Sequence, residues 1–90
     1  MITRKVSVLG STGSVGTSTL DLMAAAEATG SGRFEVEVLT GGRNVGLLAE
    51  QCLRWNPKLA VIENEVGRAE LAERLAGSGI EVGGGSDAIV

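Results

Sequence analysis

Hydrophobic and polar residues change their spacing several times along the chain, and each change predicts a new element. Short apolar or alternating runs, which are typical of strands, occupy residues 6–9, 34–38, 59–62 and 80–82. Between them, apolar residues recur every three to four positions, as on one face of a helix, over residues 14–28, 44–55 and 65–76. This strand–helix alternation with short links predicts an α/β fold with a parallel sheet and right-handed crossovers.

Turn-forming residues mark where the predicted helices begin and end. Asn44 and Asn64 stand where N-caps are expected, and Pro57 prevents the second helix from continuing. A further cap at Ser86 suggests a helix that has barely begun at the chain end. For the third helix we expect the inward face to consist of Val66, Ala69, Ala72 and Leu75.

Composition narrows the possible functions of the 90-residue chain. Eight basic and eleven acidic residues give a net charge of −3, which excludes a strongly basic nucleic-acid binder. The chain has no histidine and a single cysteine, Cys52, which excludes the common zinc sites and an intrachain disulfide. The apolar runs are too short to span a membrane. We therefore expect a cytoplasmic protein that binds neither membrane nor nucleic acid, with Cys52 as a small core residue.

The most informative stretch is a glycine-rich loop between the first predicted strand and the first predicted helix. Gly10, Gly13 and Gly16 follow the pattern G-x-x-G-x-x-G. Gly10 permits a tight turn, Gly13 lets a diphosphate approach the main chain, and Gly16 lets the helix pack closely on the strand. The free N–H groups of the first helical turn then face the anion, and the hydroxyls of Thr12 and Ser14 add donors.

Other interpretations of this loop are weaker. A P-loop needs Gly-Lys-Ser/Thr, whereas Gly16 is followed by Thr17, and a nucleophile elbow needs G-x-S-x-G, which is absent. The remaining alternative is a glycine-rich strand-to-helix turn that binds no ligand. The surrounding βαβ pattern favours the dinucleotide interpretation.

The end of the second predicted strand indicates which dinucleotide is bound. A fold selective for NAD places an acidic residue there to hold the ribose 2′-hydroxyl, but this segment reads Leu-Thr-Gly-Gly-Arg-Asn over residues 39–44. Arg43 instead offers a planar cation suited to a 2′-phosphate, with Gly42 and Asn44 beside it. The alternative is that Arg43 is a solvated loop charge. Together with the glycine loop, Arg43 favours NADP(H) over NAD(H).

Several specific runs resemble the N-terminal signature of one enzyme family. They are the run Gly-Ser-Thr-Gly-Ser-Val-Gly-Thr-Ser-Thr-Leu-Asp over residues 10–21, Gly-Arg-Asn-Val over 42–45, Glu-Gln-Cys over 50–52, and Pro57. Nearly the whole chain resembles the 1-deoxy-D-xylulose 5-phosphate reductoisomerases. The resemblance implies an NADPH-dependent oxidoreductase and isomerase that converts 1-deoxy-D-xylulose 5-phosphate to 2-C-methyl-D-erythritol 4-phosphate in non-mevalonate isoprenoid biosynthesis, assisted by magnesium or manganese.

The resemblance also implies roles for individual residues. The diphosphate would be lined by Thr12, Gly13, Ser14 and Val15. The 2′-phosphate end would be held by Gly42, Arg43 and Asn44. The family often has lysine where Arg43 stands, and either residue is cationic.

Family members are several times longer than this chain, which bears on what the segment itself can do. We expect residues 1–90 to be the N-terminal part of an incomplete, Rossmann-like NADPH-binding domain, with the catalytic and C-terminal domains absent. By the resemblance, the metal ligands and the groups that hold the phosphosugar substrate lie later, so this segment carries neither catalytic nor metal-binding residues. The full-length enzyme is implied to be a homodimer.

Two other functions remain open. One is the NADP-binding segment of another reductase with a G-x-x-G-x-x-G loop, such as the aspartate-semialdehyde type. The other is a dinucleotide-binding module without chemistry of its own.

Overall fold

The computed structural model describes residues 3–84, which form four strands and three helices in alternation. The strands are β1 (Thr3–Val8), β2 (Arg33–Gly41), β3 (Leu59–Ile62) and β4 (Glu81–Gly84). The helices are α1 (Ser14–Ala28), α2 (Val45–Trp55) and α3 (Glu65–Arg74). The helix cap expected at Ser86 lies outside the described residues.

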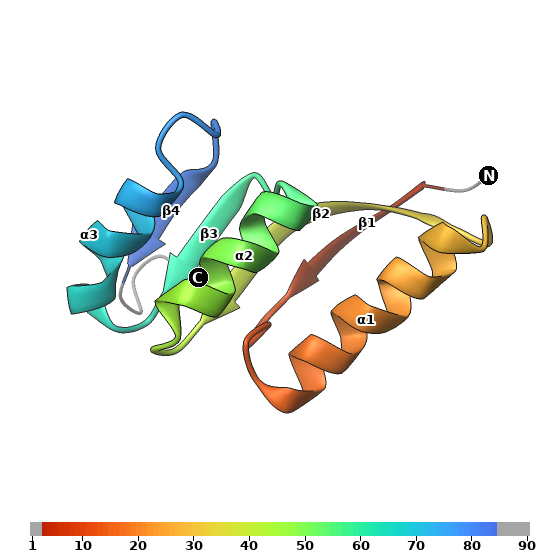
Figure 1. Ribbon diagram of the computed structural model, residues 1–90, viewed down its shortest axis with the longest axis horizontal. Coiled ribbons are helices and arrows are strands. Elements are labelled where there is room, and N and C mark those ends of the chain that lie inside the picture. Colours follow the sequence, from red (N-terminus) through yellow and green to blue (C-terminus); the bar gives the residue numbers. More distant parts are fainter. Residues whose placement is uncertain (1–2, 85–90) are drawn as a thin grey trace.

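The strands form one parallel sheet in the order β1-β2-β3-β4 (Figure 1). When parallel strands follow one another in sequence order, right-handed crossovers bring the connecting helices to the same face. Figure 1 shows α2 in front of the sheet, with α1 and α3 on either side of it. The predicted α/β class with flanking helices, as in part of a Rossmann-like domain, is confirmed.

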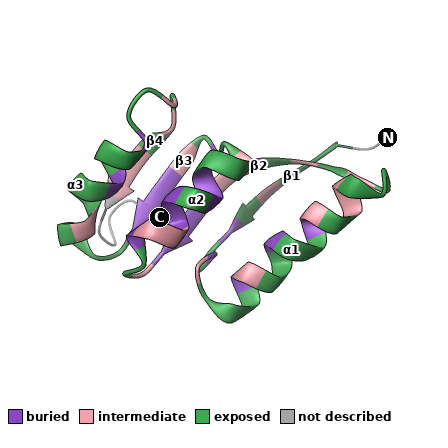
Figure 2. Cartoon of the chain, viewed as in Figure 1, coloured by how far each residue is buried: buried purple, intermediate pink, exposed green. Residues whose placement is uncertain are grey.

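The core lies between this helical layer and the central strands. Figure 2 shows buried residues concentrated in β3, in α2 and at the end of β2, while most of β1 is exposed. The largest fully buried apolar side chains are Leu39, Leu48, Ile62 and Leu71. Cys52 is also fully buried in this cluster, as expected for a small core residue. Within residues 3–84, no helix is both long and apolar enough to cross a membrane.

Apolar and charged residues alternate strictly over residues 34–38 of the sequence, but a bulge breaks the alternation in β2. Val6 pairs with Val36 but Ser7 pairs with Val38, so β2 has one residue more than β1 at this point. The extra residue shifts the inward positions. Leu39 therefore joins Val36 in the core cluster, whereas Val38 is only half-buried.

Strands β2 and β4 extend beyond their predicted ends, and the additional residues include glycines. β2 continues to Gly41, which pairs with Ile62, and β4 continues through Gly83 and Gly84, which pair with Val61 and Ile62. Pairing uses backbone groups, so a strand can run through residues that add nothing to the hydrophobic pattern.

The inward face of α3 differs from the expected one. Val66 is 86% exposed, and Ala69 and Ala72 are also exposed, whereas Leu71 is fully buried. Of the four expected residues, only Leu75 is buried. The real face is Gly67, Leu71 and Leu75, and a Cβ on Gly67 would lie 2.7 Å from Val45 Cγ2. The small size of Gly67 lets α3 approach α2 closely. Because glycine has no apolar side chain, the spacing of apolar residues did not predict this face.

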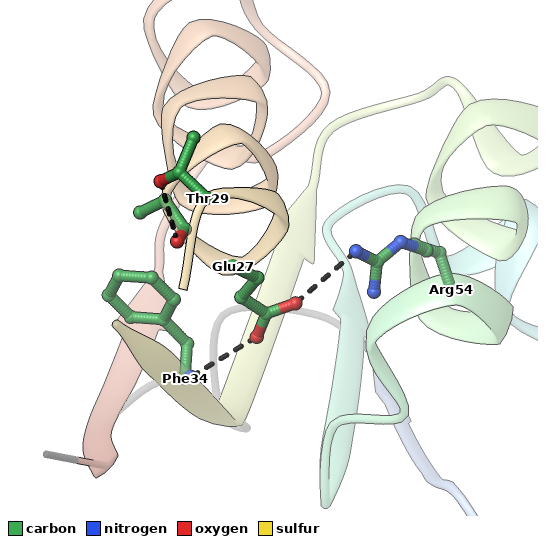
Figure 3. Close-up of polar contacts among 5 residues, drawn as sticks. Glu27, Thr29, Phe34 and Arg54 are labelled. Atoms are coloured by element: carbon green, nitrogen blue, oxygen red, sulfur yellow. Dashed lines mark hydrogen bonds and ion pairs between the residues drawn. The ribbon is translucent and has the colours of Figure 1, made fainter. Parts of the chain in front are cut away.

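At the end of the sheet away from the glycine loop, Glu27 joins three elements (Figure 3). Its carboxylate accepts from the Phe34 backbone N–H at 3.2 Å and from the Arg54 guanidinium at 3.3 Å. Arg54 also lies over the Trp55 ring, 4.2 Å from its centroid. These contacts connect the C-terminal ends of α1 and α2 to the start of β2.

Candidate phosphate-binding site

The glycine loop between β1 and α1 adopts a conformation that depends on its glycines. Gly10 has a φ of 68°, in the left-handed region that favours glycine. Its carbonyl accepts from the Gly13 N–H at 3.0 Å, which closes the turn. A Cβ on Gly16 would overlap the Gly10 carbonyl oxygen and would lie 2.6 Å from Ser11 Cα. Gly10 and Gly16 thus meet the turn and close-packing requirements expected of them.

The N-terminus of α1 is open, in contrast to those of the other two helices. Gly13 is its N-cap, no side chain caps it, and its first turn contains no acidic residue. Ser14 and Val15 are exposed there. By contrast, the side chains of Asn44 and Asn64 cap α2 and α3, as expected. The first N–H groups of α1 and the positive end of its dipole are therefore available to an anion.

A buried polar network fixes the loop to the rest of the fold. The Gly10 N–H donates to Thr40 Oγ1 and the Ser11 N–H donates to the Thr40 carbonyl, both at 2.7 Å. Ser11 Oγ donates to Gln51 Oε1 at 2.7 Å, and Gln51 Nε2 donates to the Ser11 carbonyl at 2.8 Å. Ser11, Thr40 and Gln51 are all buried. Residues from the loop, β2 and α2 thus hold one another in place.

The turn between β2 and α2 lies next to this loop, at the same edge of the sheet (Figure 1). A Cβ on Gly41 would lie 3.2 Å from both Thr12 Oγ1 and Thr12 Cγ2, so the two segments are in close proximity. Arg43, which follows two residues after Gly41, is exposed to solvent. Asn44 Oδ1 accepts from the Leu47 N–H at 3.1 Å, so this oxygen serves the helix cap.

Arg43 shares its surroundings with two carboxylates that contribute opposite charge. Gly42, Arg43, Glu63, Asn64 and Glu65 line an open depression of about 450 Å³. Glu65 is in the first turn of α3, where an acidic residue complements the helix dipole. The depression is therefore mixed in charge, which the sequence reasoning about Arg43 alone did not include.

The fold brings the two groups of predicted site residues to one edge of the sheet. Thr12, Gly13, Ser14 and Val15 lie in the loop and the first turn of α1, and Gly42, Arg43 and Asn44 lie in the neighbouring turn. The sequence reasoning missed the buried network. Two features of the sequence could have indicated it. Thr40 lies at the apolar end of the second predicted strand, and Gln51 flanks the apolar face of the second predicted helix.

Cysteine chemistry has no place in this site. Burial raises the pKa of the Cys52 thiol from 9.0 to about 12, so the thiol stays protonated at neutral pH. Among residues 3–84, no group of three or more histidine, cysteine, aspartate or glutamate side chains is arranged to hold a metal ion.

Comparison of sequences connects the chain to one family. Residues 6–90 match the family model for 1-deoxy-D-xylulose 5-phosphate reductoisomerase. The reductoisomerase of Caulobacter vibrioides is 50% identical over 86 residues, which are 96% of this chain and 21% of that protein. The Rhizobium meliloti reductoisomerase is also 50% identical, over 82 residues, which are 91% of this chain and 20% of that protein. The chain thus spans about a fifth of the relatives' length.

Comparison of structures gives the same result. The Zymomonas mobilis reductoisomerase, solved in complex with NADPH, superposes with a TM-score of 0.86 at 45% identity, covering 97% of this chain and 22% of that one. A DOX-P reductoisomerase in complex with NADPH, fosmidomycin and magnesium superposes with a TM-score of 0.82 at 24% identity, covering 97% of this chain and 20% of that one. At that identity the second likeness concerns the fold alone.

Proposed function

Since the chain belongs to the 1-deoxy-D-xylulose 5-phosphate reductoisomerase family, we propose that residues 1–90 form the N-terminal part of the NADPH-binding domain of such an enzyme. The complete protein converts 1-deoxy-D-xylulose 5-phosphate to 2-C-methyl-D-erythritol 4-phosphate in non-mevalonate isoprenoid biosynthesis. Its catalytic and C-terminal domains lie outside these residues. The Zymomonas mobilis relative, which contains the same fold at 45% identity, was solved with NADPH.

The open N-terminus of α1 fits the diphosphate of the coenzyme. Backbone N–H groups at Ser14 and Val15, together with the hydroxyls of Thr12 and Ser14, supply donors without any acidic residue in the first turn. The glycine at 13 keeps the approach to these amides clear of a side chain. In this proposal the loop binds two phosphate groups mainly through its backbone.

The β2–α2 turn fits the 2′-phosphate that distinguishes NADPH from NADH. Arg43 supplies an exposed guanidinium, and Gly42 and the amide nitrogen of Asn44 lie beside it. The carboxylates of Glu63 and Glu65 lower the positive potential in the same depression. In this proposal, the attraction for the 2′-phosphate comes from Arg43 and is opposed by these two carboxylates.

This segment contributes binding and orientation to the reaction. When bound, NADPH would supply a hydride for a carbonyl group, and in this proposal residues 12–15 and 42–44 would hold and orient the coenzyme. The divalent metal, magnesium or manganese, belongs to residues outside this chain in our proposal, as does the phosphosugar site. Homodimer formation and a cytoplasmic location stay predictions.

The observation that carries the proposal is the position of two complementary features at one sheet edge. An uncapped helix N-terminus and an exposed arginine lie in neighbouring turns, joined by the contact between Thr12 and Gly41. This arrangement fits a single ligand that carries both a diphosphate and a separate 2′-phosphate.

Replacement of Arg43 tests the coenzyme assignment. In the full-length protein, Arg43→Glu should weaken NADPH binding about ten- to a hundredfold, because the lost charge-assisted hydrogen bonds are worth about 1.5–3 kcal/mol. NADH binding should be affected much less, because NADH has no 2′-phosphate. Isothermal titration calorimetry with each coenzyme measures both effects.

Arg33→Glu is the matched control for this experiment. It makes the same change of charge at an exposed arginine at the opposite end of β2. We expect it to leave NADPH affinity within about twofold of wild type, since distant surface charges are largely screened. Equal loss of NADPH affinity in both variants, or no loss in Arg43→Glu, would contradict the assignment of Arg43.

A further inference from the structure

We propose that Gln51, which lies on α2 outside the glycine motif, is a positioning residue for the dinucleotide. In this proposal Gln51 holds the phosphate loop in its binding conformation through paired hydrogen bonds to Ser11. The inference rests on the proposed function, because it assumes that the loop binds the coenzyme diphosphate.

The Gln51 amide is the chemical complement of Ser11. The Ser11 carbonyl can only accept, so Nε2 must face it, and the two atoms are 2.8 Å apart. Oε1 then faces Ser11 Oγ, which donates to it over 2.7 Å; the other acceptor near this hydroxyl, the Thr40 carbonyl, is farther away at 3.2 Å. Both bonds are buried, and each end of the amide has one partner of the required kind. Asparagine carries the same amide on a shorter side chain, and ionised glutamate has the same length but can only accept.

These bonds restrain the part of the loop that leads to the predicted phosphate contacts. Ser11 directly precedes Thr12 and Gly13. Its carbonyl also accepts from Thr17 Oγ1 at 3.3 Å, and its N–H donates to the Thr40 carbonyl at 2.7 Å. Thr17 and Thr40 belong to the neighbouring elements α1 and β2, whereas Gln51 is the contact that α2 provides.

The position of Gln51 on α2 connects the two halves of the proposed site. α2 begins at Val45, directly after Arg43 and Asn44, and Gln51 lies in its interior. A helix is rigid over such a length, so a bond from Gln51 to Ser11 fixes the spacing between the diphosphate loop and the turn that carries Arg43. Loss of this connection should reduce affinity for the dinucleotide without changing the groups that contact it.

Gln51→Met in the full-length protein tests the proposal. Methionine keeps the length of the side chain and removes both hydrogen bonds. We expect the dissociation constant and KM for NADPH to rise about tenfold, since two net hydrogen bonds are lost from the loop restraint. We expect kcat at saturating NADPH to stay within about twofold, because the loop is held in place once the coenzyme is bound.

Cys52→Ala is the matched control for a merely structural effect. Cys52 is the next residue on the same helix and is fully buried, but its neighbours are the hydrophobic core cluster. This variant should lower the melting temperature and leave KM for NADPH unchanged. If Cys52→Ala raises KM as much as Gln51→Met does, general destabilisation accounts for the effect and the proposal is wrong.

Ser11→Ala is a second, independent test of the proposal, and it remains informative even if Gln51→Met does not fold. It deletes the hydroxyl bond and keeps the bond from Nε2 to the carbonyl, so we expect a rise in KM of about three- to fivefold. The Ser11→Ala/Gln51→Met double variant should bind NADPH about as weakly as Gln51→Met alone, because the bond to Gln51 that Ser11→Ala removes is already absent in Gln51→Met. Unchanged NADPH affinity in Ser11→Ala and in any folded Gln51 variant would overturn the proposal.

The wild-type protein separates this inference from the proposed function. If wild-type protein does not bind NADPH, the proposed function itself fails. If it binds NADPH and the Ser11 and Gln51 variants bind equally well, only the role of Gln51 fails.

Discussion

At the residue scale, the glycines of the first loop differ in what they provide. Gly10 provides a left-handed backbone conformation, and Gly13 provides a helix N-terminus without a side chain. Gly16 provides space, because a Cβ there would meet the backbone of Gly10 and Ser11. The last requirement is the strictest, since backbone atoms cannot rotate away as the end of a side chain can.

Gly16→Ala tests the need for close packing. A methyl group at residue 16 forces the backbone of the loop and α1 apart, and overpacking of this kind costs about 1–3 kcal/mol. We expect a lower melting temperature and weaker NADPH binding, which thermal unfolding and calorimetry measure.

Gly46→Ala is the comparison for that experiment. Gly46 also lies in the first turn of a helix, but its added Cβ would meet only Asn44 Oδ1, at 3.9 Å. Alanine is the better helix former, so this variant should be more stable by about 0.5–1 kcal/mol. Equal stabilisation by both substitutions would show that residue 16 has room for a side chain.

At the element scale, α3 shows how a helix can pack on a face that an apolar count does not reveal. Its inward stripe consists of Gly67, Leu71 and Leu75, while the apolar side chain of Val66 is turned outward. The stripe follows the helical period, but one of its members is a glycine. Gly67 lies close to Val45 on α2, so the buried face includes a residue that has no apolar side chain.

Leu71→Ala tests the assignment of this face. Leu71 is fully buried, so its truncation should lower the free energy of unfolding by about 2–5 kcal/mol. Val66→Ala removes an apolar side chain that is 86% exposed and should change stability by less than about 0.5 kcal/mol. Urea denaturation of the full-length variants compares the two, and a larger effect of Val66→Ala would reverse the assignment.

At the scale of the whole molecule, the parallel sheet brings its loops to a common edge. Strands β1 and β2 run in the same direction and pair over the whole of β1, so the loop after β1 and the turn after β2 lie side by side. Ligands in open α/β sheets bind at the carboxyl ends of the strands. We propose that the coenzyme binds at this edge, and in that proposal the reaction also requires residues beyond this chain.

We expect the isolated 90-residue chain not to oxidise NADPH when 1-deoxy-D-xylulose 5-phosphate and magnesium are present. The chain spans about a fifth of the relatives' length, and in our proposal the metal and substrate sites lie beyond it. The full-length protein should oxidise NADPH under the same conditions, as measured by absorbance at the coenzyme's near-ultraviolet band. A substrate-dependent decrease with the isolated chain would show that the active site is contained in these residues.

The sequence by itself determined the order of elements, the bounds of α1, the caps of α2 and α3, and the family. These features depend on local chemistry: glycine at a left-handed turn, asparagine at a helix cap, and the period of apolar residues. The predicted roles of Thr12, Gly13, Ser14, Val15, Gly42, Arg43 and Asn44 also came from the sequence, and they stay predictions that the coenzyme experiments address.

Only the tertiary structure decided the inward face of α3, the bulge in β2, the carboxylates beside Arg43 and the pairing of Ser11 with Gln51. Each of these depends on contacts between residues far apart in the sequence, as between Gly67 and Val45 or between Ser11 and Gln51. Periodicity and propensity describe one segment at a time, whereas burial and hydrogen-bond pairing depend on which segments the fold brings together.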